Sequence, residues 1–266
     1  KLAYEGLARH SPKSAEGLNA RNRIVAIEIR AGHLDVASGL IEKILVDAPD
    51  DSGALLFRAG LHFQDKKYDE AVADLRLVLR KEPNNERALL LLGQAYVQAR
   101  DPTLAKDTYR RVLEVNPKSE DGLQQLAALY AMGKEFPEAE ELLRKQVELK
   151  PDDQLASGRL VEVLMAQGQT DKAEAEARRL ASLSGQAGVG DFSLGRVLAQ
   201  KKDYSGAAEA FRKSAAARKN DPLPLEGLVR SLLAAGKPND AIAVLNQELG
   251  NSENELFAKF LLGGIY

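Results

Sequence analysis

The sequence predicts an all-α protein built from pairs of helices that repeat every 34 residues. Three residue types recur with that step over much of the chain. The alanines are Ala3, Ala37, Ala71, Ala105, Ala139, Ala173, Ala207 and Ala241. The prolines are Pro49, Pro83, Pro117 and Pro151, and the leucines are Leu92, Leu126, Leu160, Leu194, Leu228 and Leu262. A fixed period of this kind is the sequence mark of a repeat architecture, in which each repeat is one supersecondary unit.

Residues 86–119 show how one period encodes two helices and the turn between them. Apolar residues recur at helical spacing in both halves, at Leu89, Leu92, Tyr96 and Val97 and then at Ala105, Tyr109, Val112 and Leu113. Between the halves lies ARDPT, a turn signal whose proline suits the first turn of a second helix. Because proline cannot continue a helix, the prolines of the 34-residue series mark the ends of successive repeats.

The remaining segments follow from this period. Residues 1–17 are expected to hold the second helix of a preceding partial repeat. Seven repeats are expected over residues 18–255, beginning at residues 18, 52, 86, 120, 154, 188 and 222. Residues 256–266 are expected to form the first helix of a truncated eighth repeat. This last segment is apolar rather than the polar cap that a solenoid end needs, so we expect the chain to continue or this end to pack on another chain.

The pattern breaks in the fifth repeat, which lacks its closing proline. In its place stands SLSGQAGVGD, residues 182–191, with three glycines. Glycine is permissive in turns and unfavourable inside helices, so we expect a longer loop between repeats here. The alternative is a hinge that lets the later repeats swing against the earlier ones.

Composition narrows the function classes. The chain has 266 residues with 37 basic and 39 acidic side chains, and this lacks the basic excess typical of nucleic-acid binding. It has no cysteine, which rules out disulfides, thiolate zinc sites and cysteine nucleophiles and suits either the cytoplasm or the bacterial periplasm. No apolar run reaches the roughly 20 residues of a membrane span.

No motif in the sequence predicts catalysis, a cofactor or a metal. None of the three histidines, His10, His33 and His62, has the partner spacing of a helical metal site. GQAGVG follows a helical pattern and lacks the lysine of a phosphate-binding loop, and no G-x-S-x-G nucleophile elbow is present. Acidic pairs such as Asp152–Asp153 fall at expected helix starts, where carboxylates favour the helix dipole. We therefore expect a non-enzymatic protein.

The period and its residue pattern resemble the tetratricopeptide repeat, a helix–turn–helix unit of 34 residues. In the family's register the small residue of position 8 is Gly93, Gly195 or Gly263 in three repeats, and Ala59 or Ala127 in two others. Position 11 holds Tyr96, Tyr130 and Tyr266, and position 24 holds Tyr109 and Phe211. The resemblance covers essentially the whole chain and implies an α-solenoid, a right-handed superhelix of stacked helix pairs.

The resemblance also implies a concave groove lined by the first helix of each repeat, mostly through positions 2, 5, 6, 9, 12 and 13. Carried onto this chain, those positions give a partner-binding set: Asn22, Arg23, Leu56, Phe57, Phe63, Leu90, Gln94, Gln98, Gln124, Arg159, Glu162, Phe192, Arg196 and Arg230. The early members are apolar, and we expect Leu56, Phe57, Phe63 and Leu90 to form an exposed patch. The late arginines, Arg159, Arg196 and Arg230, suit the carboxylates of a peptide. Alternatively they are solvated or paired with a neighbouring Glu162 or Glu226.

These observations favour a protein–protein interaction scaffold that binds a peptide segment or a partner domain, without nucleic acid. One alternative is an accessory array of a larger machine, such as a bacterial envelope or exopolysaccharide secretion system or a glycosyltransferase, as the resemblance allows. Another is end-to-end self-association through the apolar ends.

Overall fold

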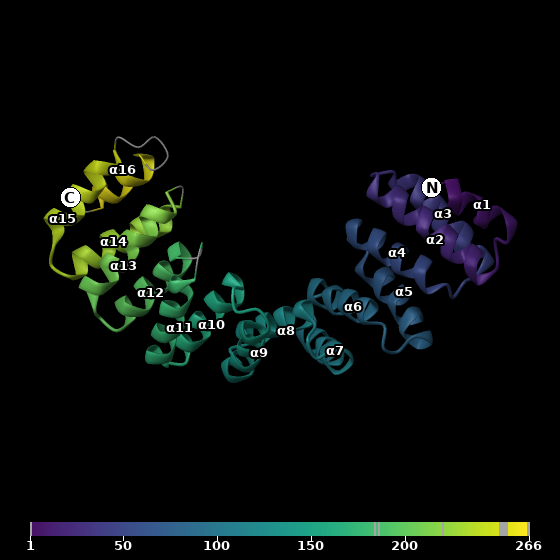
Figure 1. Ribbon diagram of the computed structural model, residues 1–266, viewed down its shortest axis with the longest axis horizontal. Coiled ribbons are helices and arrows are strands. Elements are labelled where there is room, and N and C mark those ends of the chain that lie inside the picture. The colour runs from purple at the N-terminus through teal and green to yellow at the C-terminus, as the bar shows by residue number, and fades with distance from the viewer. Residues whose placement is uncertain (1, 184, 186, 220, 250–254, 265–266) are drawn as a thin grey trace. The chain divides into compact units, whose positions relative to one another are not determined.

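The computed structural model describes residues 2–183, 185, 187–219, 221–249 and 255–264, and their secondary structure is helical throughout. The chain forms two compact units, Lys1–Leu129 and Tyr130–Tyr266. Each unit is a row of antiparallel helices joined by short turns, as Figure 1 shows. The predicted α-solenoid of helix pairs is therefore confirmed.

The first unit contains the helices from α1 to most of α8. Helices α2, α4, α6 and α8 are the first helices of successive pairs, and α3, α5 and α7 are second helices. Their bounds are α1 Leu2–His10, α2 Ala15–Arg30, α3 Leu34–Asp47, α4 Ser52–Gln64, α5 Tyr68–Lys81, α6 Glu86–Gln98, α7 Pro102–Val115 and α8 Glu120–Met132. Consecutive helices from α1 to α7 pack on one another, and α2 also contacts α4, the first helix of the next pair.

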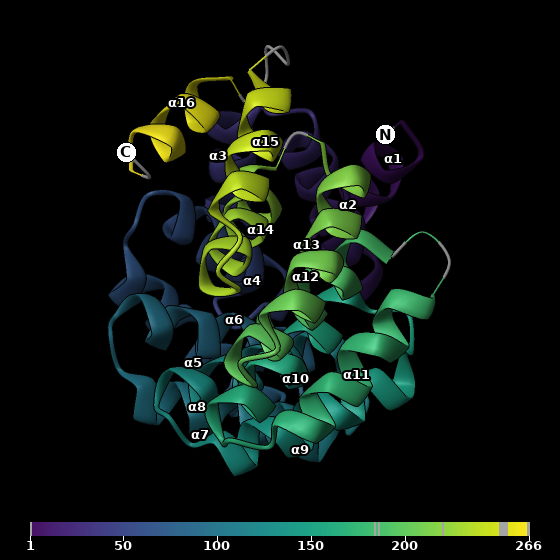
Figure 2. The same cartoon turned by 90° about the vertical axis from the view of Figure 1, so that its left-hand side faces the viewer.

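The second unit continues the same alternation. Its helices are α9 Phe136–Leu149, α10 Gln154–Ala166, α11 Thr170–Ser182, α12 Ala187–Gln200, α13 Tyr204–Ala217, α14 Pro222–Ala234, α15 Pro238–Glu248 and α16 Glu255–Gly263. The pairs α10/α11 and α12/α13 lie side by side in Figure 2, and α10, α12 and α14 also contact each other in sequence. Tyr266, assigned above to an aromatic position, lies outside the described residues.

The turns inside the pairs explain much of the sequence period. Among the described residues, a backbone with positive φ recurs every 34 residues, at Gly32, Lys66, Arg100, Lys134, Gly168, Lys202 and Gly236. This left-handed conformation reverses the chain just after each first helix. An aspartate can then cap the second helix by accepting a backbone N–H bond, as Asp101 does from Leu104 at 3.0 Å.

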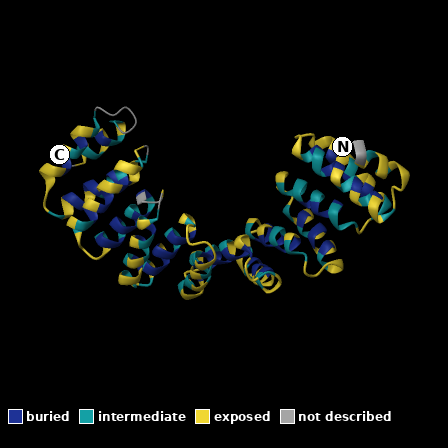
Figure 3. Ribbon diagram, viewed as in Figure 1, coloured by how far each residue is buried: buried dark blue, intermediate teal, exposed yellow. Residues whose placement is uncertain are grey.

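The core lies between the helices, with buried residues on the faces that meet neighbouring helices (Figure 3). In two repeats the contact is between a glycine and an aromatic ring. A methyl group added to Gly93 would lie 2.7 Å from the Tyr109 ring, which is 1% exposed. Phe211 fits in the same way between Gly195 and Gly227. The small residue of position 8 therefore makes room for the aromatic residue of position 24.

The expected long loop at residues 182–191 is wrong. Helix α11 ends at Ser182 and α12 begins at Ala187, so the second half of this segment is helical. Two of the three glycines serve close packing, since a methyl group at Gly190 would lie 2.1 Å from the Ala181 backbone nitrogen and one at Gly188 would lie 2.9 Å from Ala217. The third, Gly185, has a positive φ of 76°. The hinge stays a prediction.

In the part of the chain that the structure describes, none of the helices has the length and apolar character needed to cross a lipid bilayer.

Candidate functional site

Two pockets, one in each unit, bring together residues of the predicted groove. The first has a volume of about 880 Å³ and is lined by Asn22, Arg23 and Phe57, among others. The second has a volume of about 330 Å³ and is lined by Phe192, Arg196 and Arg230, among others. Each pocket lies within its own unit, and the two are described separately.

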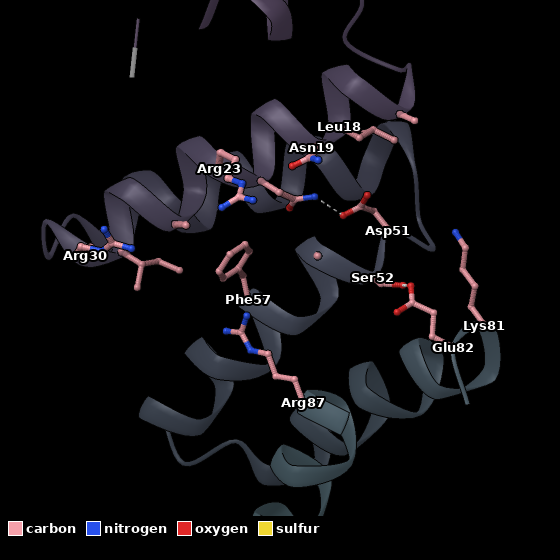
Figure 4. A pocket seen from close by; sticks show the side chains of 15 residues that line it. Leu18, Asn19, Arg23, Arg30, Asp51, Ser52, Phe57, Lys81, Glu82 and Arg87 are labelled. Carbon is pink, nitrogen blue, oxygen red and sulfur yellow. Dashed lines mark hydrogen bonds between the residues drawn. The ribbon is translucent and has the colours of Figure 1, made fainter. Parts of the chain in front are cut away.

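The first pocket lies between α2 and α4, with side chains from the end of α5 and the start of α6 (Figure 4). Helix α2 supplies Asn19, Arg23 and Arg30 from one face, because these positions lie three to four residues or two turns apart. Helix α4 supplies Phe57, which is half-buried. Asp51, which precedes α4, lies at the opposite end of the pocket from Arg30.

The acidic residues of this pocket are engaged by neutral donors. Asp51 caps α4 by accepting from the Ala54 N–H at 2.8 Å, and it also accepts from Asn22 Nδ2 at 2.7 Å. Glu82 accepts from the Ser52 hydroxyl and from Asn85. These donors lower the pKa of Glu82, which therefore remains a carboxylate at neutral pH. The acidic side chains of this pocket thus form hydrogen bonds at the junctions between helices.

Lys81 is also engaged, because its Nζ lies 2.9 Å from Asp50 Oδ2. That contact raises the pKa of Lys81 and lowers the pKa of Asp50. Both groups are well exposed, so the pair contributes little to stability.

The arginines of the pocket differ from its other charged groups. Figure 4 shows Arg23 on one side of the Phe57 ring and Arg87 on the other, with Arg30 at the same end of the pocket. The Arg87 guanidinium carbon lies 5.7 Å from the centre of the Phe57 ring, a cation–π contact. Within the described residues, none of the three arginines makes an ion pair or a hydrogen bond to a carboxylate. The site therefore holds three arginines that pair with no acidic side chain among the residues that the structure describes.

The second pocket is smaller and more apolar. Phe192 packs edge-on against Phe211, with ring centres 5.7 Å apart, and the Arg218 guanidinium carbon lies 5.2 Å from the centre of the Phe192 ring. Leu223 and Met165 complete the apolar lining.

The arginines of the second pocket are paired. Arg196 Nη1 lies 2.6 Å from Glu162 Oε1, and Arg230 Nη2 lies 2.6 Å from Glu226 Oε1. For Arg196 and Arg230 the structure shows the pairing with neighbouring glutamates, and binding of peptide carboxylates by the late arginines stays a prediction.

Of the four residues expected to form an exposed apolar patch, one is buried and three are half-buried. Leu56 is 8% exposed, and Phe57, Phe63 and Leu90 are half-buried. Helix α4, which carries Leu56, Phe57 and Phe63, contacts α2, α3 and α5. Phe63 packs edge-on against Tyr68, with ring centres 5.6 Å apart. Of these four residues, Phe57 lines the first pocket and the others support the packing.

The remaining predicted residues do not line either pocket. Gln94 and Gln98 are exposed on α6, Gln124 is half-buried on α8, and Arg159 is half-buried on α10. Their assignment to a binding surface stays a prediction.

Sequence reasoning missed Arg30 and Arg87, which complete the arginine group of the first pocket. The repeat register contained the signal. With repeats beginning at residues 18 and 86, Arg30 occupies position 13 and Arg87 occupies position 2, both groove positions. Reading every groove position in every repeat would have found them.

Two of the three histidines, His33 and His62, lie beside carboxylates. His33 Nδ1 lies 2.9 Å from Glu28 Oε2, and His62 Nε2 lies 3.6 Å from Asp74 Oδ2. Asp74 is itself held by two bonds from Arg58, at 2.7 and 2.9 Å. In the described part of the chain, no group of three or more histidine, aspartate or glutamate side chains has the geometry to hold a metal ion.

Two family models, both described as tetratricopeptide repeat, match the chain. One matches residues 62–132 and 130–183, and the other matches residues 27–86 and 159–222. Together the matched segments run from residue 27 to residue 222 without a gap. No curated protein matches the chain in sequence.

Solved structures with the same fold are numerous. The C-terminal part of a TPR repeat-containing protein from Cytophaga hutchinsonii has a TM-score of 0.72 at 15% identity, covering 89% of this chain and 98% of that one. YrrB, described as a TPR protein with an unusual peptide-binding site, has a TM-score of 0.59 at 19% identity, covering 70% and 96%. MamA has a TM-score of 0.58 at 21% identity, covering 64% and 92%. Structural likeness at sequence identities this low shows a shared fold alone.

Proposed function

The chain belongs to the tetratricopeptide-repeat family, and from that premise we propose that it is a non-enzymatic scaffold that binds a peptide segment or a partner domain. We place the principal binding site in the pocket between α2 and α4 of the first unit. Proteins of this family are in general interaction scaffolds, and the finer assignment follows from the pocket.

One observation carries the proposal: the first pocket displays side chains that the fold does not use. Its acidic residues cap helices and tie repeats together, whereas Arg23, Arg30 and Arg87 make no such bonds among the described residues. A volume of about 880 Å³ falls within the range of a ligand site, and here it is open along a helix face. Side chains that contribute little to stability yet gather around one aromatic ring are typical of a binding surface.

The described peptide-binding site of YrrB, which shares the fold, is consistent with such a role. None of the descriptions of the three structures named above mentions secretion or a glycosyltransferase. The accessory-array alternative therefore stays a prediction.

The test is affinity capture from a lysate of the source organism, followed by mass spectrometry. The baits are the unaltered chain, the single variants Phe57→Ala and Arg196→Glu, and the double variant. We expect at least one protein to be retained by the unaltered chain, reduced by Phe57→Ala and absent from the double variant. Circular dichroism should give the same helicity for every bait.

The matched control is Arg80→Gln, which changes an exposed side chain on α5 outside the pocket. Capture that is equal on all baits would refute binding in either pocket.

A second candidate is self-association through α16. Leu256 is 84% exposed and Phe260 is 75% exposed, and the Phe260 ring stacks on Phe257 with centres 6.5 Å apart. Large apolar side chains on one helix face are typical of a protein contact. Sedimentation should show a mass that rises with concentration and becomes constant in Leu256→Gln/Phe260→Gln. A constant mass in the unaltered chain would contradict this candidate.

A further inference from the structure

We infer that the first pocket takes an acidic polypeptide segment, with side-chain carboxylates of that segment bound by Arg23, Arg30 and Arg87. This inference rests on the proposed function and names the chemistry of the partner.

Charge complementarity is the first step. The pocket contains Arg23, Arg30, Arg87 and Lys81 against Asp51 and Glu82. Lys81 is paired with Asp50, and both acids are bonded to neutral donors at the helix junctions. What remains for a partner is a set of guanidinium groups, and the planar fork of arginine matches the two oxygens of a carboxylate.

The number of arginines is the second step. One carboxylate offers about four lone-pair sites on its two oxygens, which suffice for at most two two-pronged arginines. Three arginines therefore fit several carboxylates better than one. A segment with two or more aspartate or glutamate side chains supplies them, whereas a lone C-terminal carboxylate does not.

The spacing of the arginines is the third step. Arg23 and Arg30 are seven residues apart on α2, which places their Cα atoms roughly 10 Å apart along the helix. An extended chain advances about 3.3 Å per residue. A segment that runs along α2 would therefore meet both arginines with acidic residues about three positions apart.

Phe57 gives the segment an apolar contact between the charges. Its ring is half-buried, with Arg87 at 5.7 Å from its centre and Arg23 on the other side. A partner that displaced water from this ring would strengthen the nearby charge pairs, because their interaction grows as the local dielectric falls. We therefore expect an apolar residue between the acidic ones.

The experiment is a selection from a random twelve-residue library displayed on phage, with the full chain as the immobilised target. The peptides are fused to the coat protein through their C termini, so they offer side-chain carboxylates and no free terminal one. We expect the recovered peptides to be enriched in aspartate and glutamate about three positions apart. Counter-selection uses Arg23→Gln/Arg30→Gln/Arg87→Gln.

The matched control is Arg80→Gln/Arg100→Gln/Lys118→Gln, which removes three positive charges from exposed positions of the same unit that do not line the pocket. A recovered peptide, synthesised with an amidated C terminus, is then titrated by fluorescence anisotropy. We expect its affinity to fall at least tenfold on the pocket variant and to change less than twofold on the control variant. Replacing its glutamates by glutamine should have the same effect as the pocket variant.

Each outcome is decisive. Acidic enrichment that is lost on the pocket variant supports the inference. Acidic enrichment that survives on that variant overturns it, because the carboxylates then bind elsewhere. Peptides without acidic enrichment that Phe57→Ala no longer retains overturn the inference and leave the proposed function standing. Recovery no better than from a blank surface overturns the binding of peptide segments altogether.

Discussion

Both pockets lie along first helices of their repeats, yet their charges are arranged differently. In the first unit Arg23, Arg30 and Arg87 line one pocket with Phe57, without an acidic partner among the described residues. In the second unit each pocket arginine is paired, Arg196 with Glu162 and Arg230 with Glu226.

The difference shows that one repeat register can hold both a pocket with unpaired arginines and a pocket whose arginines are paired. The register fixes which positions line a pocket, because the first helix of each pair presents the same face. The residues at neighbouring positions then decide whether a positive charge remains for a partner. A glutamate four residues before an arginine neutralises it within one helix turn, as Glu226 does for Arg230.

The largest effect should come from the packing that both units share. We expect Gly93→Ala in the first unit and Gly195→Ala in the second each to lower the free energy of unfolding by about 2 kcal/mol. The added methyl groups would lie 2.7 Å from the Tyr109 ring and 2.8 Å from the Phe211 ring, and buried rings cannot move aside. Urea unfolding followed by circular dichroism measures the change.

Gly60→Ala and Gly158→Ala are the controls, one in each unit. No atom outside the local helix lies within 4 Å of the added methyl group. These variants should gain roughly 0.5–1 kcal/mol from the better helix propensity of alanine. A loss equal to that of Gly93→Ala would mean that glycine serves helix geometry and not ring packing.

The charge difference between the two pockets can be tested by removing the glutamates that pair with the arginines of the second pocket. In the background Arg23→Gln/Arg30→Gln/Arg87→Gln, the added pair Glu162→Gln/Glu226→Gln should restore binding of an acidic peptide. We expect about a tenfold gain over the background, or roughly 1.4 kcal/mol, measured by fluorescence anisotropy.

Glu209→Gln is the control, because Glu209 pairs with Lys213 at 3.0 Å on α13, outside the pocket. If the gain is absent, something other than acidic partners distinguishes the two pockets.

The turns offer a smaller test of the register that the units share. Arg100 in the first unit and Lys202 in the second have φ of 58° and 64°. The left-handed region is unfavourable for side chains other than glycine. Arg100→Gly and Lys202→Gly should therefore each stabilise the fold by about 0.5–1 kcal/mol.

Gly168→Ala, at φ 73°, should destabilise the fold by a similar amount. The measurement is the urea midpoint of each variant. Opposite signs in the two units would show that their turns are not equivalent.

The smallest effect should come from copying the second pocket's arrangement into the first. Asn19→Glu places a glutamate four residues before Arg23, as Glu226 stands before Arg230. We expect the affinity for an acidic peptide to fall about threefold, since an exposed helix pair of this kind is weak. Asn19→Gln, which adds length without charge, should leave the affinity unchanged. An equal loss in both variants would indicate a steric effect.

Most of the fold could be predicted because each repeat is encoded by residues that lie close together in the sequence. Helical spacing, turn residues and closing prolines each depend on a few neighbouring residues. Because these patterns recur in repeat after repeat, the helices and turns are strongly predicted. The same register located Arg23, Phe57, Arg196 and Arg230 at pocket walls. These positions follow from the resemblance to the family, which implies that they line the groove.

The parts that could not be predicted depend on neighbours outside the repeat. Leu56 is buried because three helices surround α4, which a single repeat does not reveal. The pairing of Arg196 with Glu162 joins two helices and depends on side-chain conformations that the sequence leaves open. Residues 187–191 look like a loop from their glycines, yet they are helical because the glycines let α12 approach α11 and α13 closely.

The even spacing of the left-handed turns has a consequence for how such a chain can change its length. Every turn, cap and closing proline keeps its place only if residues are added or removed between repeats in whole steps of 34. A shift of any other size would put a helix former where the backbone must reverse, and a proline inside a helix. Duplication or loss of an entire repeat is therefore the change in length that this architecture tolerates best. Recombination between neighbouring repeats produces such a change and keeps the existing junctions between repeats.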